Sequence, residues 1–177
     1  MFSNRATTRF ESVVLTHLDA AHNLARWMVR SDHDAQDVVQ EACLRAFRSF
    51  ETFRGGDGRC WLLTIVRNTC HTWLERNRRH EPAPLGDDTT DLASDACDPL
   101  QLALRAADAA LVRDAIETLP ADFRETIVLR DIEGLSYKEI AGVVGIPIGT
   151  VMSRIARARE RLAATLAPRV AAEVEQP

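Results

Sequence analysis

The residues best suited to contact another molecule lie in the run LSYKEIAGVVGIPIGTVMSRIARARERL, from Leu135 to Leu162. If its second half is helical, small side chains form one narrow edge and arginines flank that edge. An uncharged tip with guanidinium flanks suits the major groove of DNA, because the tip meets base edges and the arginines contact phosphates. The small residues are Gly149, Ser153 and Ala156, and the flanks are Thr150, Arg154, Arg157 and Arg161 on one side and Met152 and Arg159 on the other.

Local signals around this run predict two short helices joined by a tight turn. Ser136 can cap the first helix, and Glu139 three residues later can complete a capping box. Gly145 can take a left-handed turn conformation, and Pro147 sits just ahead of the second helix. The apolar stripe Val151, Ile155, Ala158 and Leu162 would pack that helix on the first. An arginine-rich helix alone usually solvates an outer face, but these turn signals favour a DNA-binding helix-turn-helix at about 136–162.

Charge is distributed unevenly along the 177 residues, whose formal net charge is −4. The stretch 54–80 is rich in arginine, whereas 81–99 contains acidic residues and neither lysine nor arginine. Two basic regions separated by an acidic strip fit contact with DNA at two places better than a uniformly acidic protein would.

Hydrophobic periodicity predicts an all-α fold with two small helical domains joined by a flexible acidic linker. Helices are expected at about 8–30, 34–53, 59–79, 100–119 and 120–132, followed by the helix-turn-helix of the C-terminal domain. Prolines at 82 and 84 end the third helix, and no helical periodicity follows before residue 100. The predicted organisation is a domain at 8–80, a linker at 81–100, a domain at 101–168 and a frayed tail at 169–177.

Two further helices carry polar patterns of interest. The run DAQDVVQEACLRAFRSF directs Val38, Leu44 and Phe47 toward the interior, and its polar face would ordinarily be solvated surface; that face holds Asp34, Asp37, Gln40, Glu41 and Arg45. The helix at 59–79 interleaves tryptophans with arginines, a combination typical of single-stranded DNA platforms. For Trp61 the simpler interpretation is a core position.

The cysteines, Cys43, Cys60, Cys70 and Cys97, form no Cys-x-x-Cys pair, so we interpret them as free thiols in a reducing compartment. A zinc or redox site using Cys60, Cys70 and His71 stays open as an alternative, although these residues lack the spacing of paired zinc ligands. We expect no metal, no cofactor and no enzymatic activity, because no catalytic constellation is visible. The first nine residues lack an apolar core and no membrane-length apolar run occurs, so we expect a cytoplasmic protein without membrane insertion.

Taken together, these segments resemble the extracytoplasmic-function (ECF) sigma factors, a compact branch of the sigma-70 family of bacterial transcription initiation factors. DAQDVVQEACLRAF is similar to the family's segment that docks on core RNA polymerase. FRGGDGRCWLLTIVRNTCHTWLERNRR is similar to its promoter-opening segment, and LSYKEIAGVVGIPIGTVMSRIARARERL to its reader of the upstream element. The resemblance covers nearly the whole chain.

The resemblance implies a role for each segment. The polar face Asp34, Asp37, Gln40, Glu41 and Arg45 would contact the clamp coiled coil of the largest polymerase subunit. In the promoter-opening segment, Asn68 with Thr69, Cys70 and His71 would lie where the family captures a base flipped from the minus-10 element. The Asn68 amide suits this role because it can both donate and accept hydrogen bonds. The resemblance adds Arg67, Trp73 and Arg76 as further minus-10 contacts, and assigns minus-35 reading to Ile148, Gly149, Thr150, Met152, Ser153, Arg154 and Arg157.

Met152 departs from the family, which often has a basic residue there. Its thioether cannot bind phosphate or guanine but could contact a thymine methyl group, so the promoter sequence does not transfer. The resemblance also implies core RNA polymerase, promoter DNA and an unidentified anti-sigma factor as partners. A conventional helix-turn-helix regulator, acting on palindromic DNA without polymerase, stays open as the alternative function.

Overall fold

The computed structural model describes residues 4–77 and 99–174, which are helical throughout apart from short turns. We call residues 4–77 the N-terminal unit and residues 99–174 the C-terminal unit. The N-terminal unit comprises α1 (Asn4–Val14), a 3-10 turn (Leu15–His17), α2 (Leu18–Val29), α3 (Asp32–Ser49), a second 3-10 turn (Phe50–Thr52) and α4 (Gly58–Asn77). The C-terminal unit comprises α5 (Pro99–Thr118), α6 (Ala121–Ile127), a π-helical segment (Val128–Ile132), α7 (Tyr137–Val144) and α8 (Ile148–Val174).

The N-terminal unit is built on α2, α3 and α4, each of which contacts the other two. Their apolar faces supply fully buried side chains such as Leu24, Val38 and Leu62. The expected helix at 8–30 is interrupted by the 3-10 turn, and it ends at Arg30, whose φ of 64° is left-handed. Trp61 is half-buried against Phe50 and Phe53, which agrees with its interpretation as a core residue.

Side-chain caps fix where α3 and α4 begin. The hydroxyl of Ser31 accepts a hydrogen bond from the backbone N–H of Asp34, and this cap starts α3. The Asp57 carboxylate accepts from the backbone N–H groups of Arg59 and Cys60 at the first turn of α4. Gly55 and Gly56 adopt positive φ angles in the preceding turn, a conformation that glycine tolerates without steric cost.

The predicted helix-turn-helix is confirmed in α7 and α8. Ser136 and Glu139 form the capping box, and Gly145 ends α7 with a φ of 73°. The stripe Val151, Ile155 and Ala158 is buried. Beyond it, α8 continues through Pro168 to Val174, although the sequence pattern predicts a frayed tail from residue 169.

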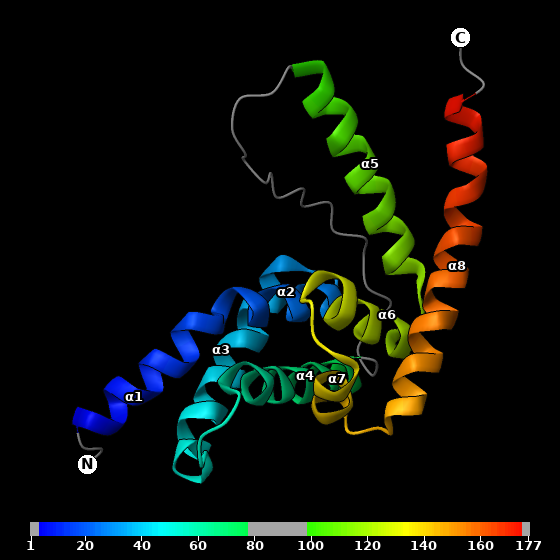
Figure 1. Ribbon diagram of the computed structural model, residues 1–177. Coiled ribbons are helices and arrows are strands. Elements are labelled where there is room, and N and C mark those ends of the chain that lie inside the picture. The colour runs from blue at the N-terminus through cyan, green and yellow to red at the C-terminus, as the bar shows by residue number, and fades with distance from the viewer. Residues whose placement is uncertain (1–3, 78–98, 175–177) are drawn as a thin grey trace.

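The two units lie against each other. Helix α2 contacts α6, α4 contacts α7, and one hydrophobic core continues through both units. Four consecutive residues of α6, from Arg124 to Ile127, are buried, because neighbouring elements surround this short helix. Helices α5 and α8 project side by side from this body (Figure 1). The sequence predicts the two units but gives no sign that they pack together, and the linker at 81–98 lies outside the described residues.

Within residues 4–77 and 99–174, no single helix is long and apolar enough to cross a membrane. Helix α7 and the α8 segment Ile148–Pro168 are together long and apolar enough, but the chain bends by 103° at the break between them.

The capping box makes a stability prediction. Replacing Ser136 with alanine leaves the Glu139 N–H without its side-chain acceptor, so Ser136→Ala should lower the free energy of unfolding by about 1 kcal/mol. Denaturant unfolding monitored by circular dichroism measures this loss. Ser12→Ala is the matched control, because the exposed Ser12 hydroxyl donates only within α1, and it should unfold as the parent chain does. Equal midpoints for the two variants would contradict the prediction.

Candidate nucleic-acid interface

The tip of α8 presents an exposed apolar pair beside small residues. Ile148 and Met152 are both about half exposed, with Met152 at 51%, and Gly149 is also exposed. Ser153 is exposed as well, and its hydroxyl donates to the carbonyl of the half-buried Thr150. Water-exposed apolar side chains at a helix tip can make contact with thymine methyl groups.

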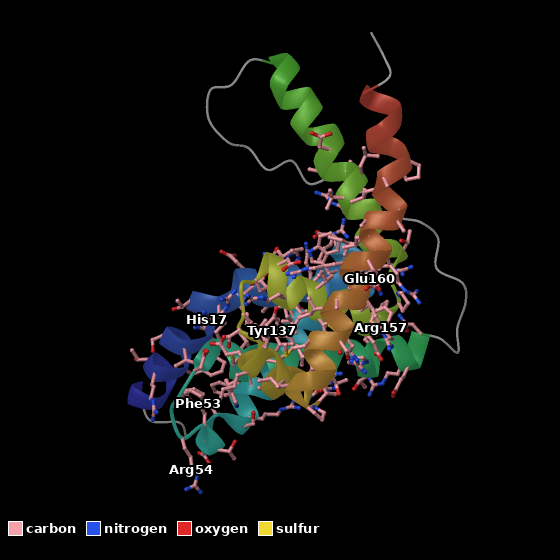
Figure 2. The ribbon with its side chains drawn as sticks, turned by 45° about the vertical axis from the view of Figure 1, so that its right-hand side comes forward. His17, Phe53, Arg54, Tyr137, Arg157 and Glu160 are labelled. Atoms are coloured by element: carbon pink, nitrogen blue, oxygen red, sulfur yellow. The ribbon has the colours of Figure 1, made fainter. Side chains whose placement is uncertain are left out.

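The arginines of α8 are not equivalent. Arg157 is exposed and lies on the part of α8 that borders the body of the molecule (Figure 2). Arg154 is largely covered and pairs with Asp122 at 2.9 Å. Arg159 pairs with Asp131 at 2.7 Å, and Arg161 lies over the Phe123 ring at 5.0 Å. Arg157 is therefore the predicted minus-35 arginine that this conformation leaves most accessible.

The predicted minus-10 residues share α4 but do not share one environment. Asn68 to His71 lie within a continuous helix, not in a loop of the kind that the family resemblance implies. Asn68 and Arg76 are exposed, and Trp73 is half-buried against the core. Thr69 is buried with its hydroxyl donating to the Ile65 carbonyl, so its expected contact with DNA has no support in this conformation.

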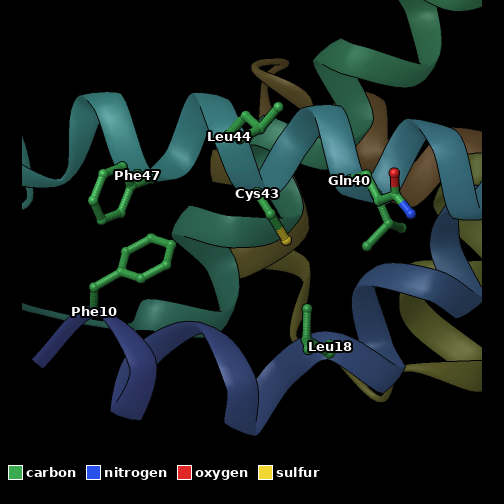
Figure 3. A pocket seen from close by; sticks show the side chains of 7 residues that line it. Phe10, Leu18, Gln40, Cys43, Leu44 and Phe47 are labelled. Atoms are coloured by element: carbon green, nitrogen blue, oxygen red, sulfur yellow. The ribbon is translucent and has the colours of Figure 1, made fainter. Parts of the chain in front are cut away.

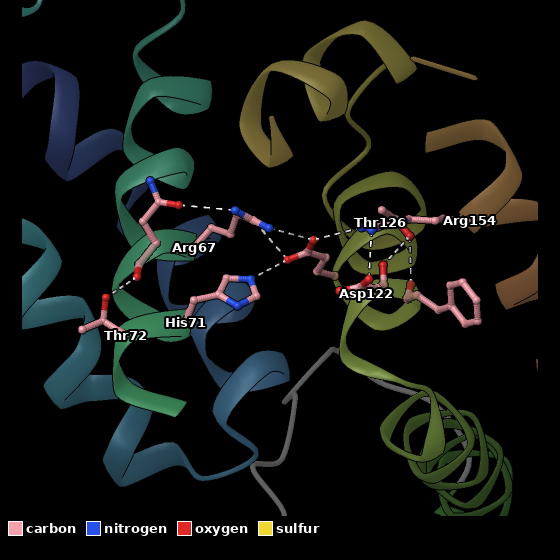
Figure 4. Close-up of polar contacts among 9 residues, drawn as sticks. Arg67, His71, Thr72, Asp122, Thr126 and Arg154 are labelled. Atoms are coloured by element: carbon pink, nitrogen blue, oxygen red, sulfur yellow. Dashed lines mark hydrogen bonds and ion pairs between the residues drawn. The ribbon is translucent and has the colours of Figure 1, made fainter. Parts of the chain in front are cut away.

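Arg67 and His71 instead contact the C-terminal unit through Glu125 of α6. The Glu125 side chain is 0% exposed. Its carboxylate accepts hydrogen bonds from Arg67 Nε at 3.1 Å and Nη2 at 3.2 Å, and it lies 3.1 Å from His71 Nε2 (Figure 4). Arg154 of α8 is also close, at 3.7 Å from Glu125. We call these four residues the Glu125 cluster.

Electrostatics explain why a carboxylate is stable in this position. Burial alone raises the pKa of Glu125, but hydrogen bonds from His71 and Arg67 outweigh that effect and hold the pKa below its ordinary value. Glu125 is therefore ionised at neutral pH, and its charge is compensated by the cations around it.

Two more glutamates of the C-terminal unit contact the N-terminal unit. The Glu133 carboxylate accepts from Arg59 at 2.6 Å and from Asn23 at 3.4 Å. The Glu117 carboxylate lies 3.8 Å from Arg26, and the backbone carbonyl of Glu117 accepts from Arg30 at 2.6 Å. In each of these ion pairs the acid belongs to the C-terminal unit and the base to the N-terminal unit, so the packed surfaces are complementary in charge.

The predicted polymerase-binding face lies on α3, away from the Glu125 cluster. Asp37, Gln40 and Glu41 are exposed, and Asp34 is half-buried next to the Ser31 cap. Arg45 donates to Glu41 at 2.9 Å, and this hydrogen bond lowers the pKa of the Glu41 carboxyl. This face remains open to solvent in the described conformation.

An apolar pocket of about 540 Å³ adjoins that face, between α1, the start of α2 and α3 (Figure 3). Gln40 belongs both to the polar face and to the pocket wall. Leu44 is 54% exposed at the rim, so the prediction that it points inward is wrong. The lining residues are Phe10, Leu18, Val39, Gln40, Cys43, Leu44 and Phe47.

Cys60, Cys70 and His71 do not come together as a zinc site. Among the described residues, the potential metal ligands that approach one another closely enough are Asp57, Cys60 and Glu139. The Cys60 thiol donates to Asp57, while Asp57 and Glu139 cap α4 and α7 respectively. These structural roles account for the group, and Cys97 lies outside the described residues.

Sequence reasoning missed Glu125 and its contacts across the two units. Glu125 lies between Phe123 and Ile127 in a short helix, where periodicity gives a single acidic residue no special meaning. Its importance comes from partners more than 50 positions earlier, Arg67 and His71, and only the tertiary fold brings these together.

Family comparisons assign both units. Residues 13–80 match the model "Sigma-70 region 2", and residues 109–162 match "Sigma-70, region 4". The chain is 38% identical to the RNA polymerase sigma-H factor of Pseudomonas aeruginosa, over 90% of this chain and 86% of that protein. It is 38% identical to the ECF RNA polymerase sigma-E factor of Escherichia coli, covering 73% and 72%. It is 35% identical to the ECF sigma factor SigE of Mycolicibacterium smegmatis over 89% of this chain, but spans only 61% of that longer relative.

Solved structures resemble the fold as a whole. The sigma factor RpoE of Bartonella quintana, in complex with the anti-sigma factor NepR, superposes with a TM-score of 0.73 and 29% identity, covering 90% of this chain and 97% of that one. CnrH, in complex with the cytosolic domain of CnrY, gives a TM-score of 0.63 at 29% identity, covering 92% and 90%.

The described cysteines should react slowly in the folded protein. Burial raises the pKa of Cys70 and of Cys60 to about 12, and it raises the pKa of Cys43 as well. Because the thiolate is the reactive form, alkylation at pH 8 should be at least about tenfold slower in the folded Cys97→Ser variant than after unfolding in guanidinium. Iodoacetamide labelling followed by peptide mass spectrometry reports each site. Rapid labelling of any one of the three before unfolding would contradict this and would revive the redox interpretation.

Proposed function

Because the chain belongs to the ECF subfamily of the sigma-70 family of sigma factors, we propose that it binds bacterial core RNA polymerase and directs it to specific promoters. The observation that carries the proposal is the pairing of a capped helix-turn-helix in the C-terminal unit with a region 2 helical unit in the same chain. The pairing distinguishes a sigma factor from a conventional helix-turn-helix regulator, for which the helix-turn-helix alone would suffice.

The domain predicted at 101–168, which lies within the C-terminal unit, reads the minus-35 element. Ile148 and Met152 supply exposed apolar contacts, and the backbone at Gly149 allows close approach to base edges. Thr150 and Ser153 supply hydroxyl groups, and Arg154 and Arg157 supply positive charges that bind the DNA phosphates. With Met152 at the tip, the readout at this position favours a thymine methyl group over guanine.

The domain predicted at 8–80 recognises and opens the minus-10 element, and the linker predicted at 81–100 connects it to the C-terminal domain. Exposed Asn68 is the candidate for reading an extruded base, because its amide can pair with a Watson–Crick edge. Arg67, His71 and Arg76 contribute positive or hydrogen-bonding groups along the same helix, and Trp73 offers an aromatic edge. Binding energy drives strand separation, and the polymerase supplies all the chemistry.

The polar face of α3 is the proposed contact with the polymerase. Asp37 and Glu41 of this face are solvent-exposed, and the pocket beside Gln40 offers apolar area next to them, a mixture typical of protein interfaces. The similarity to RpoE of Bartonella quintana, whose structure is a complex with the anti-sigma factor NepR, supports an anti-sigma factor as a further partner of this chain. The residues do not specify which protein this partner is. Work with polymerase and chromosomal DNA requires a cytoplasmic location.

The proposed function is tested by in vitro transcription with purified core polymerase on fragmented genomic DNA, with co-elution of the two proteins measured in the same sample. New start sites that share two spaced upstream elements are the expected result. Asp37→Lys should reduce co-elution and transcription together by at least about fivefold, because it reverses a charge at the interface. Asp19→Lys, the same change at an exposed position of α2, is the control. DNA binding without co-elution or new starts would identify a conventional regulator instead.

Asn68→Ala separates promoter opening from polymerase binding. Loss of the amide should lower open-complex formation by about tenfold, since one specific base contact is worth about 1–3 kcal/mol, and co-elution with core should stay unchanged. Permanganate footprinting of unpaired thymines measures opening. Asn77→Ala, the same substitution at the exposed end of α4, should behave as the parent chain. Parallel loss of opening and polymerase binding would show that Asn68 is structural.

A further inference from the structure

We propose that Glu125 is an intramolecular competitor of promoter DNA: in the free chain it holds Arg67 and His71 of α4 in a closed form that must open before these two side chains can bind DNA. This inference rests on the proposed function for the DNA-facing roles of those residues. The closed form itself rests on the contacts alone.

One carboxylate engages candidate DNA-binding residues from both units. Arg67 and His71 lie 3.1–3.2 Å from the Glu125 oxygens, and Arg154 lies 3.7 Å away. A carboxylate and a phosphate offer similar anionic oxygens to a guanidinium group. Glu125 thus occupies the position on Arg67 that a DNA phosphate would need, and the two cannot be bound there together.

Access to Arg67 is restricted in the closed form. The Arg67 side chain is only 19% exposed, and its guanidinium group is bound to Glu125 of α6. The α6 residues that follow Glu125, Thr126 and Ile127, are themselves buried. Nucleic acid therefore cannot reach Arg67 along α4 while α6 stays in place.

The packed surfaces are also joined by complementary charge along their length. Arg59 with Glu133, and Arg26 with Glu117, repeat the arrangement of base on the N-terminal unit and acid on the C-terminal unit. A buried ion pair contributes little net stability compared with apolar packing, but removal of one partner is strongly destabilising. A polyanion such as DNA can therefore replace the glutamates as the partner of the N-terminal arginines once the two units separate.

Glu125→Gln tests the proposal in the full-length chain without polymerase. The substitution keeps the side-chain shape and removes the charge that holds Arg67 and His71. Two readouts are used: hydrogen–deuterium exchange in α4 and α6, and binding of a fluorescein-labelled twenty-nucleotide oligo-dT at low salt. We expect faster exchange in both helices, and oligo-dT binding that is tighter by about five- to a hundredfold, the usual range of coupling between two sites.

Asp131→Asn is the matched control, because it breaks the exposed ion pair with Arg159 inside the C-terminal unit. It should change neither readout. Arg59→Gln is the second variant: it breaks the other buried pair, with Glu133, without altering any predicted DNA contact. It should shift both readouts in the same direction as Glu125→Gln, and it keeps the test decisive if Glu125→Gln fails to fold.

Two results would overturn the proposal. Unchanged exchange and unchanged DNA binding in both interface variants would show that the Glu125 cluster does not hold the units together. Faster exchange without tighter oligo-dT binding would show that the closed contact does not limit access to DNA. Neither readout uses polymerase, so a chain that opens and binds DNA but fails to support transcription would refute the proposed function and leave the closed form standing.

Discussion

A carboxylate removed from water must be paired with cations or bear a proton, and the environment of Glu125 satisfies this requirement with residues from both units. Arg67 and His71 come from α4, and Arg154 comes from α8. Residues Arg124 to Ile127 of α6 are buried among neighbouring elements, and α4 also contacts α7 directly. The relative placement of the two candidate DNA-binding helices therefore depends on this ionic contact together with the α4–α7 contact and the apolar core around them.

Features of the fold that are local in sequence could be predicted from sequence. The capping box at Ser136 and Glu139, the left-handed Gly145 and the stripe Val151, Ile155 and Ala158 each depend on spacing within a few turns of helix, and all are observed. The start of α3 at the Ser31 cap and the 3-10 break after Val14 are also local, but periodicity does not resolve element ends at that level. The packing of one unit on the other is a tertiary property, and no period or motif encodes it.

The candidate sites show the same division. Periodicity places the polar residues of α3 on one exposed face, but it gives Leu44 to the interior, whereas the structure leaves this side chain at the rim of an open pocket. Thr69 falls within the promoter-opening motif, yet its β-branched side chain faces the core and bonds to the preceding turn. Motif membership locates a functional segment, and only the fold decides which of its side chains reach solvent.

The closed arrangement affects the candidate surfaces unequally. Asp37 on the proposed polymerase face is 61% exposed and the pocket beside it is open, whereas Arg67 and Arg154 are covered. Under the two proposals, core polymerase can therefore bind the closed chain, while DNA cannot reach Arg67 until α6 has moved. Polymerase binding would then precede opening, and any interaction that polymerase makes more favourably with the separated units would shift the chain toward the DNA-competent form. By the same reasoning, a ligand that bridges α4 and α6 would inhibit the chain without touching the exposed tip of α8.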